Sequence, residues 1–314
     1  MELLTDKNRA GRTVREVLQK ELGFSSNLIK RLKFSENGIL VNGEWVTVRY
    51  ELREGDVLSL AVEDRERDVS PYLIPVDLPL PILYEDEWIT AVNKPPDMPA
   101  HPSQGHRLDT AANALAHHFR DRVYVFRPVN RLDRDTSGCM LTSNTKDASY
   151  KMYTAMTEGR IHKEYLAVLD GVPEKREGTL LSLMRRKPNS VIEREECSPD
   201  CPDGKRAETR YRVLADNGRE SVVAARPVTG RTHQIRVQFA GIGCPVTGDT
   251  LYGKSSPLIA RHALHSLRTS FPHPMTGETL TVEAPLPADM TALLEALGLP
   301  GAELLLQPEG DELR

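Results

Sequence analysis

The chain has 314 residues, of which 39% are hydrophobic and 27% charged, and this composition indicates a globular protein with one large core, or a large and a small one. Its formal net charge of −4 argues against blanket, non-specific binding of nucleic acid, although a local basic face would still permit binding. The start, MELLTDKNRAGR, lacks the apolar core of a signal peptide, and no apolar run is long enough to cross a bilayer. The four scattered cysteines favour a reducing compartment. We therefore expect a cytoplasmic protein without a membrane partner.

Residues 1–63 predict a small α/β domain. A helix through REVLQKEL is followed by a second helix through NLIKRLKF, and short strands around ILVNG and DVLSLAV complete the unit. Ser25-Ser26-Asn27 supplies candidate N-caps for the second helix. Lys30, Arg31 and Lys33 lie within one turn of that helix, a cluster that on its own suits a solvated face.

Residues 64–80 are charged and then proline-rich without a sustained period, which is the composition of a semi-rigid linker. From residue 81 to residue 300 many strands are expected with few helices, which favours an α+β domain around a mixed or antiparallel sheet. The expected strands lie in ILYE, WITAVN, MLTSN, KEYLAVLDG, TRYRVLA, ESVVAARPV, THQIRVQFA and GETLTVEAP, and the expected helices in TAANALAHHF and DASYKMYTAM. Residues 301–314 are expected to form a C-terminal tail.

The densest polar run is NRLDRDTSG at residues 130–138. Its Asp135-Thr136-Ser137-Gly138 suits a turn, and it also matches the Asp-Thr/Ser-Gly signature of aspartic proteases, but those enzymes need two such aspartates and this chain has one copy. Asp133 lies between Arg131 and Arg134, and a carboxylate close to arginines stays ionised. An ionised carboxylate suits a nucleophile or a stabiliser of a cationic sugar centre rather than a general acid.

Polar and apolar residues alternate in THQIRVQF at residues 232–239. As a strand, this stretch would place Ile235, Val237 and Phe239 on a buried face and Arg236 on a polar face. Such a strand could form the floor of a cleft, and a plain surface strand fits the same pattern.

Three further features are less specific. Tyr165 lies in the expected strand KEYLAVLDG, where a lone tyrosine usually packs in the core with its hydroxyl at the rim. Cys197 and Cys201 are four residues apart without a second pair, so a polar loop with free thiols is favoured over a zinc site, and we assign no metal. The segment at residues 184–209 is longer than expected between strands, which leaves a substrate-contacting insertion and a disordered surface loop both open.

Several of these stretches, in this order, resemble motifs of the RluA-type family of RNA pseudouridine synthases, from about Leu83 to Pro287. The family pattern His-Arg-Leu-Asp-x-x-Thr-Ser-Gly corresponds to NRLDRDTSG, Lys-x-Tyr to KEY at 163–165, and Thr-Gly-Arg-Thr-His-Gln-Ile-Arg to TGRTHQIR at 229–236, followed by GDTLYG. The N-terminal residues resemble, less closely, a small basic RNA-binding domain named after a ribosomal protein, through GRTVREVL, LIKRLK, ILVNG and GD.

The resemblance implies an isomerase that breaks the bond between the uracil nitrogen and ribose, turns the base and rejoins it through a ring carbon, without a cofactor or metal. The family's catalytic aspartate falls on Asp133, which either attacks the anomeric carbon or removes a ribose proton. Arg236 would be its salt-bridge partner, Tyr165 would stack on the uracil and assist proton transfer, and Ile235 would form the apolar side of the base pocket.

The implied partner is ribosomal or transfer RNA, bound by a monomer. The target uridine would be flipped out at a cost of about a few kcal/mol, with Arg131 filling the vacated space and Lys30, Arg31 and Lys33 contacting phosphates. Asn130 stands where the family has histidine and is interpreted as loop support. The alternative function is a non-catalytic RNA-binding or ribosome-assembly protein that has kept the fold.

Overall fold

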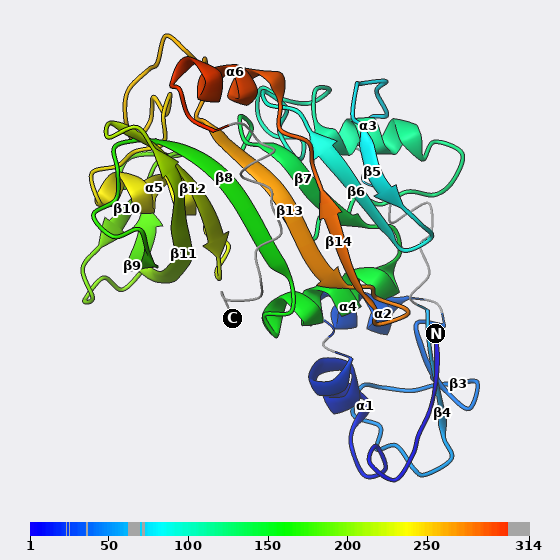
Figure 1. Cartoon of the computed structure of the whole chain (residues 1–314). Helices are drawn as coiled ribbons and strands as arrows, with labels where there is room; N and C mark the ends of the chain where they lie inside the picture. Colours follow the sequence, from blue (N-terminus) through cyan, green and yellow to red (C-terminus); the bar gives the residue numbers. More distant parts are fainter. Residues whose placement is uncertain (23, 25, 36, 62–69, 71–72, 301–314) are drawn as a thin grey trace.

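The computed structural model describes residues 1–22, 24, 26–35, 37–61, 70 and 73–300, which form two sheets (Figure 1). The first sheet is antiparallel with the strand order β1-β4-β2-β3. Its elements are β1 (Glu2–Leu4), α1 (Val14–Glu16), the π-helix η1 (Val17–Glu21), α2 (Ser26–Phe34), β2 (Ile39–Val41), β3 (Glu44–Trp45) and β4 (Val57–Leu60).

The helices and strands expected in the N-terminal region are confirmed. Thr13 is the N-cap of the first helix, and its side chain and that of Glu16 form a reciprocal capping box. Of the predicted caps of α2, Ser25 lies outside the described residues, whereas Ser26 and Asn27 belong to the helix itself. Buried apolar side chains from α1, η1, α2, β2 and β4, among them Leu18 and Leu58, form a core of their own. The domain boundaries stay a prediction.

The second sheet has ten strands in the order β10-β9-β11-β12-β8-β13-β7-β6-β5, with β14 paired to β13. All of its pairs are antiparallel except β7 with β13, so the expected α+β fold with a mixed sheet is confirmed. Its strands are β5 (Ile82–Glu85), β6 (Ile89–Lys94), β7 (Ser137–Ser143), β8 (His162–Asp170), β9 (Glu177–Arg186), β10 (Arg194–Cys197), β11 (Lys205–Asp216), β12 (Glu220–Pro227), β13 (Leu264–Pro272) and β14 (Thr279–Glu283).

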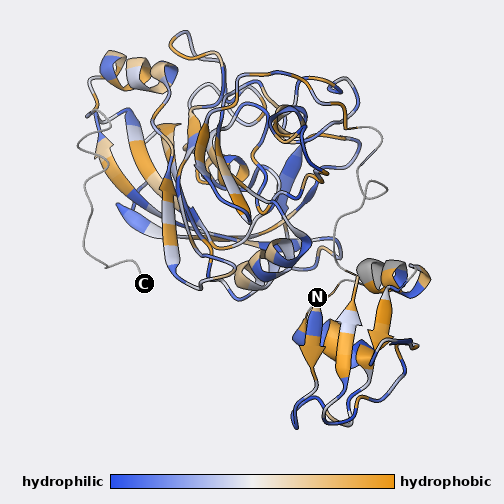
Figure 2. Ribbon diagram, turned by 90° about the vertical axis from the view of Figure 1, so that its right-hand side faces the viewer, coloured by the Kyte–Doolittle hydropathy of each residue, from blue (hydrophilic) through white to orange (hydrophobic). Residues whose placement is uncertain are grey.

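Four helices accompany this sheet: α3 (Ala111–His118), α4 (Lys146–Thr157), α5 (Gln234–Gly241) and α6 (Ala288–Ala296). Helix α4 packs on β7 and β13, and α5 packs against the strands from β9 to β12. Figure 2 shows hydrophobic stretches along the strands of both sheets. Tyr150 of α4 contacts the N-terminal region, where its ring meets Phe24 edge-on at 5.7 Å and its hydroxyl donates to the carbonyl of Glu21 at 2.7 Å. In the described part of the chain, no helix is both long and apolar enough to cross a membrane.

The expected strand at residues 232–239 is wrong, because Gln234–Gly241 is the helix α5. The prediction assumed that polar residues mark an exposed face, but the whole stretch from Gln234 to Phe239 is buried. Gln238, for example, accepts from the Thr209 hydroxyl at 2.7 Å and donates to the Ala207 carbonyl at 3.1 Å. The polar side chains are buried and hydrogen-bonded to specific partners. The alternation of polar and apolar residues therefore does not mean that every second residue is exposed, as it would be in a strand.

Three further differences concern strands and a turn. The long segment at residues 184–209 is not a disordered loop, since it holds the end of β9, all of β10 and the start of β11. Cys197 ends β10, and Cys201 lies in the turn that follows. The predicted turn at Asp135-Thr136-Ser137-Gly138 ends earlier, because Ser137 and Gly138 already belong to β7. The elements β9, β10, β13 and α6 were not predicted.

Gly138 permits the single parallel strand contact of the second sheet. It pairs with Ser266 of β13 at φ +109°, and a Cβ atom at this position would lie 2.2 Å from the Ser266 carbonyl oxygen. Only glycine fits both the backbone angle and the approach of the neighbouring strand.

We expect Gly138→Ala to lower the free energy of unfolding by about 3 kcal/mol or more, because strain and a backbone clash act together. Gly218→Ala is the matched control, since Gly218 has φ +85° and no atom lies within 4 Å of the position that a Cβ would take there, so the change should cost only about 1 kcal/mol. Urea denaturation measures both, and equal losses would contradict a requirement for close strand approach at Gly138.

Candidate active site

A pocket of ≈ 780 Å³ opens between the loop before β7, strand β8, the β9–β10 hairpin and the N-terminal end of α5. Its volume lies within the range of about 300–1,000 Å³ that is usual for small-molecule sites. The sequence-predicted residues that line it are Arg131, Asp133, Tyr165, Ile235 and Arg236. Lys30 and Lys33 lie on α2 and are not among its lining residues, and the side chain of Arg31 lies outside the described part of the chain.

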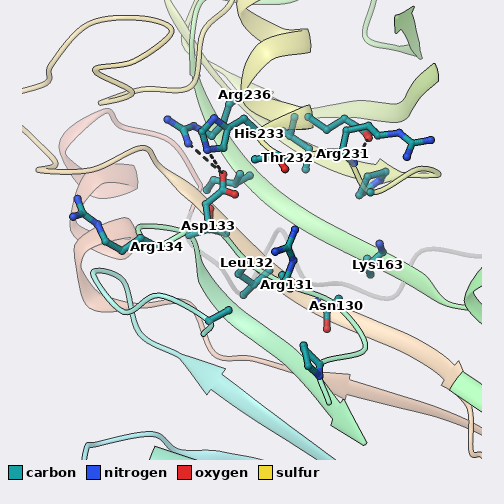
Figure 3. Close-up of a pocket in the computed structure, with 18 of the residues that line it drawn as sticks. Asn130, Arg131, Leu132, Asp133, Arg134, Lys163, Arg231, Thr232, His233 and Arg236 are labelled. Carbon is teal, nitrogen blue, oxygen red and sulfur yellow. Dashed lines mark hydrogen bonds and ion pairs between the residues drawn. The ribbon is translucent and has the colours of Figure 1, made fainter. Parts of the chain in front are cut away.

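The positively charged partner of the Asp133 carboxylate comes from a distant part of the chain. Nη1 of Arg236 donates to Oδ2 of Asp133 at 3.2 Å, and Nε2 of His233 lies 3.8 Å from the same oxygen (Figure 3). Arg134, its neighbour in sequence, points away and pairs with Asp135 instead. The Asp133 side chain is 25% exposed, so it can meet a ligand in the pocket.

Arg236 is itself fixed by a second carboxylate. Its Nε and Nη2 donate to the two carboxylate oxygens of Asp249 at 2.6 and 2.8 Å, and the Asp249 side chain has 0% exposure. Although burial acts to lower the pKa of Arg236, its bonds to Asp249 and Asp133 outweigh this and raise it. Burial likewise acts to raise the pKa of Asp249, but Arg236 and the backbone N–H of Leu251 hold it below 3.8. Asp249 belongs to the motif GDTLYG, but the sequence alone assigned it no role.

His233 is a second residue that sequence reasoning missed. It precedes α5 in the left-handed region at φ 58°, and burial lowers its pKa below 6.5, which favours a neutral ring. Its Nδ1 lies 2.7 Å from the Tyr252 hydroxyl, which accepts from the Arg194 backbone N–H at 2.8 Å. The hydroxyl proton can therefore be donated to Nδ1, an arrangement that suits a proton on Nε2, facing Asp133.

Two buried basic side chains hold the backbone just after Asp133. Lys94 is completely buried, and its Nζ donates to the carbonyl of Arg134 at 2.8 Å as well as to the carbonyls of Pro95 and Met98. Arg261 donates to the carbonyl of Asp135 at 2.9 Å. The loop has no strand partner at these positions, so these side chains supply the hydrogen bonds that its carbonyls require.

Asn130 supports the same loop from its N-terminal side. Its Oδ1 accepts from the backbone N–H of Leu141 in β7 at 2.8 Å. Asp135 lies in the turn after Asp133, next to Arg134, and does not line the pocket. The two aspartates of the run thus differ in position: Asp133 lines the pocket, and Asp135 lies outside it beside Arg134.

Tyr165 and Ile235 form part of the pocket wall and are 8% and 5% exposed. Burial, together with the nearby charge of Asp133, raises the pKa of Tyr165 well above 10, so the phenol stays protonated at neutral pH. Lys163, two residues earlier in β8, also lines the pocket, and burial lowers its pKa.

Comparison with known proteins gives consistent matches. A family model described as RNA pseudouridylate synthase matches residues 89–241. The uncharacterized RNA pseudouridine synthase YjbO of Bacillus subtilis is 41% identical over 280 residues, which cover 88% of this chain and 96% of that protein. The ribosomal large subunit pseudouridine synthase D of Vibrio parahaemolyticus is 36% identical over 284 residues, 82% of each chain. The solved structure of human RNA pseudouridylate synthase domain containing 4 shares the fold, with a TM-score of 0.58 and 22% identity over 70% of this chain and 94% of that one.

We expect Asp249→Asn to lower the free energy of unfolding by about 3–5 kcal/mol at neutral pH, because it leaves the buried Arg236 charge uncompensated. The pKa of Asp249 is held below 3.8 in the folded protein, so its contribution is complete above that value and is lost as the pH falls through the lower folded value. The difference between the two proteins in urea denaturation should therefore shrink in acid.

Asp133→Asn is the matched control for this experiment. It removes the same charge from a side chain that is 25% exposed and leaves the pair of Arg236 with Asp249 intact. Its effect on the free energy of unfolding should stay within about 1 kcal/mol. Equal destabilisation by both substitutions would show that the two carboxylates do not differ in structural role.

Proposed function

The chain belongs to the RluA-type RNA pseudouridine synthase family and is therefore an isomerase, and from this premise we propose that it converts specific uridines of ribosomal or transfer RNA to pseudouridine with Asp133 as the catalytic carboxylate. The observation that carries the proposal is the Asp133 carboxylate, which faces a ≈ 780 Å³ pocket with Arg236 at 3.2 Å. The names of two relatives, from Vibrio parahaemolyticus and Pasteurella multocida, refer to the large ribosomal subunit, which favours ribosomal RNA as the substrate.

The reaction breaks the N1–C1′ bond of uridine and forms a C5–C1′ bond, while C5 loses a proton and N1 gains one. No atom is added and no electron is removed, so the balance requires neither a cofactor nor an oxidant. Asp133 serves in either of two ways: it attacks C1′ to form a covalent intermediate, or it removes the C2′ proton to give a glycal. Both routes require an oriented carboxylate, and the contact with Arg236 at 3.2 Å holds the Asp133 carboxylate in place.

The walls of the pocket suit a uracil base. Tyr165 offers a ring for stacking and a protonated hydroxyl for hydrogen bonding, so at neutral pH it assists proton transfer as a phenol rather than as an ionised base. Ile235 supplies an apolar side. A uridine in folded RNA reaches this pocket only after it leaves its stack, at a cost of about a few kcal/mol.

Arg131 is suited to replace the departed base in the RNA. It is exposed at the pocket and makes no hydrogen bond or ion pair with the described residues, and its planar guanidinium can stack on neighbouring bases. In the N-terminal region, Lys30, Arg31 and Lys33 of α2 are proposed to contact phosphates, with residues 1–63 as a small RNA-binding domain. We further propose that the protein acts as a monomer in the cytoplasm.

We expect Asp133→Asn to lower the rate of pseudouridine formation about 10⁴-fold or more, because it removes the reactive oxygen charge. Loss of the C5 proton allows a direct measurement: tritium release from ribosomal and transfer RNA transcripts that carry 5-tritiated uridine. The affinity for RNA should stay within about threefold of the wild type, since phosphate contacts dominate it.

Asp135→Ala is the control, since Asp135 lies outside the pocket and should affect the rate less than about tenfold. Full turnover by Asp133→Asn would reject Asp133 as the catalytic group. Equal losses from both substitutions would assign the role to the loop rather than to one carboxylate. Mapping pseudouridines in cellular RNA with and without the protein then identifies the target.

A further inference from the structure

The hairpin of β9 and β10 lies at the edge of the large sheet (Figure 1). Arg186 of β9 and Arg194 of β10 both line the pocket, and they are direct partners in the register of the two strands. Met184, two residues before Arg186 on the same strand face, packs with Val237 of α5. The face that carries the two arginines is therefore the one turned toward α5 and the pocket.

The opposite face of the hairpin has complementary charges. Arg185 pairs with its register partner Glu195 at 2.7 Å, and Lys187 pairs with Glu193 at 2.8 Å. On the pocket face the arrangement is reversed, because Arg186 stands opposite another arginine. Like charges directly opposite each other destabilise a sheet. The Arg186–Arg194 position thus lacks the opposite-charge pairing that Arg185 and Lys187 show on either side of it.

Neither arginine has a carboxylate partner in the described part of the chain. The guanidinium of Arg194 donates only to the backbone carbonyls of Ile192 and Glu193, at 3.0 and 2.9 Å. Arg186 forms no ion pair with the described residues and is exposed. The free protein therefore leaves the positive charges of this pair uncompensated.

The whole pocket shares this imbalance, although the chain as a whole carries a net charge of −4. Its only carboxylate among the described lining residues is that of Asp133, which Arg236 already holds. Apart from Arg134, whose side chain pairs with Asp135, the lysine and arginine residues that line it are Arg131, Lys163, Arg186, Arg194, Arg231 and Arg236. An excess of this kind in a pocket indicates an anionic ligand.

We propose that Arg186 and Arg194 together bind one backbone phosphate of the RNA strand, next to the uridine that enters the pocket. This inference rests on the proposed function and adds to it a binding site for the substrate backbone. Phosphate oxygens accept paired hydrogen bonds from guanidinium groups, and a phosphate between the two arginines turns their repulsion into two attractive contacts.

The position of the pair places this phosphate close to the reacting sugar. The backbone N–H of Arg194 donates to the Tyr252 hydroxyl at 2.8 Å, that hydroxyl contacts His233 at 2.7 Å, and His233 lies 3.8 Å from Asp133. The hairpin is thus joined to the catalytic carboxylate by short contacts, which favours a phosphate of the target nucleotide or of its neighbour.

Arg186→Ala and Arg194→Glu test the site in the full-length protein, with Arg185→Ala as the matched control on the opposite face. The probe is a fluorescein-labelled single-stranded RNA of about 20 nucleotides, long enough to span the site of a single-strand-binding domain. The dissociation constant is measured as a function of KCl concentration. Each pocket-face variant should weaken binding about tenfold and lower the slope of log Kd against log[KCl] by about one, whereas the control should change neither.

Two further readouts separate binding from folding and from chemistry. Arg194→Glu places a carboxylate opposite Arg186, so the Tm of this variant should equal or exceed that of the wild type while its RNA affinity falls. In tritium release, KM should rise about tenfold while the single-turnover rate at saturating RNA stays within about threefold, because the contact acts on binding.

Unchanged salt slopes in both pocket-face variants would overturn the phosphate site, as would an equal loss of affinity in Arg185→Ala. If the wild type releases tritium and the variants match it in KM, the phosphate site fails while the proposed function stands. If the wild type releases no tritium from any RNA, the proposed function fails, and the salt slopes still decide whether the arginines bind a phosphate.

Discussion

The buried ion pair of Arg236 with Asp249 is the interaction on which the proposed active site depends. A guanidinium without a partner would be costly in the interior, and the carboxylate of Asp249, with 0% exposure, compensates it through two short bonds. Because Nε and Nη2 are occupied in this way, Nη1 has a fixed direction and meets Asp133 at 3.2 Å. Asp133 can therefore stay partly exposed to a substrate while Arg236, on its buried side, fixes its orientation.

The site exists only when the whole second sheet is assembled. Arg236 and Asp133 are 103 positions apart in the chain, Arg261 and the Asp135 carbonyl 126, and Lys94 and the Arg134 carbonyl 40. These contacts join the end of β6, helix α5 and the segment just before β13 to the loop before β7. Gly138 adds a steric condition, since the parallel contact of β7 with β13 requires the absence of a side chain. Stability of the sheet and geometry of the pocket are thus coupled.

Much of the site could be predicted from the sequence, but its support could not. The motif resemblance places Asp133, Tyr165 and Arg236 by number, and the structure brings them to one pocket. The role of Asp249 depends on burial and on a partner 13 positions away, which no local pattern reveals. The helix α5 was wrongly predicted as a strand because its polar residues are buried and satisfied by specific hydrogen bonds. The polarity of a residue therefore did not indicate whether it is exposed. The Arg186–Arg194 pair becomes visible only when strand register is known.

The most direct test of the account is the single-turnover rate of pseudouridine formation by Arg236→Lys on an unmodified ribosomal RNA transcript. Lysine keeps the positive charge beside Asp249 but lacks the planar fork that holds two carboxylates at once. We predict a folded protein with near-wild-type RNA affinity whose rate is about 100-fold lower, because Asp133 loses its orientation. A rate within about threefold of the wild type would contradict the claim that Arg236, fixed by Asp249, positions the catalytic carboxylate.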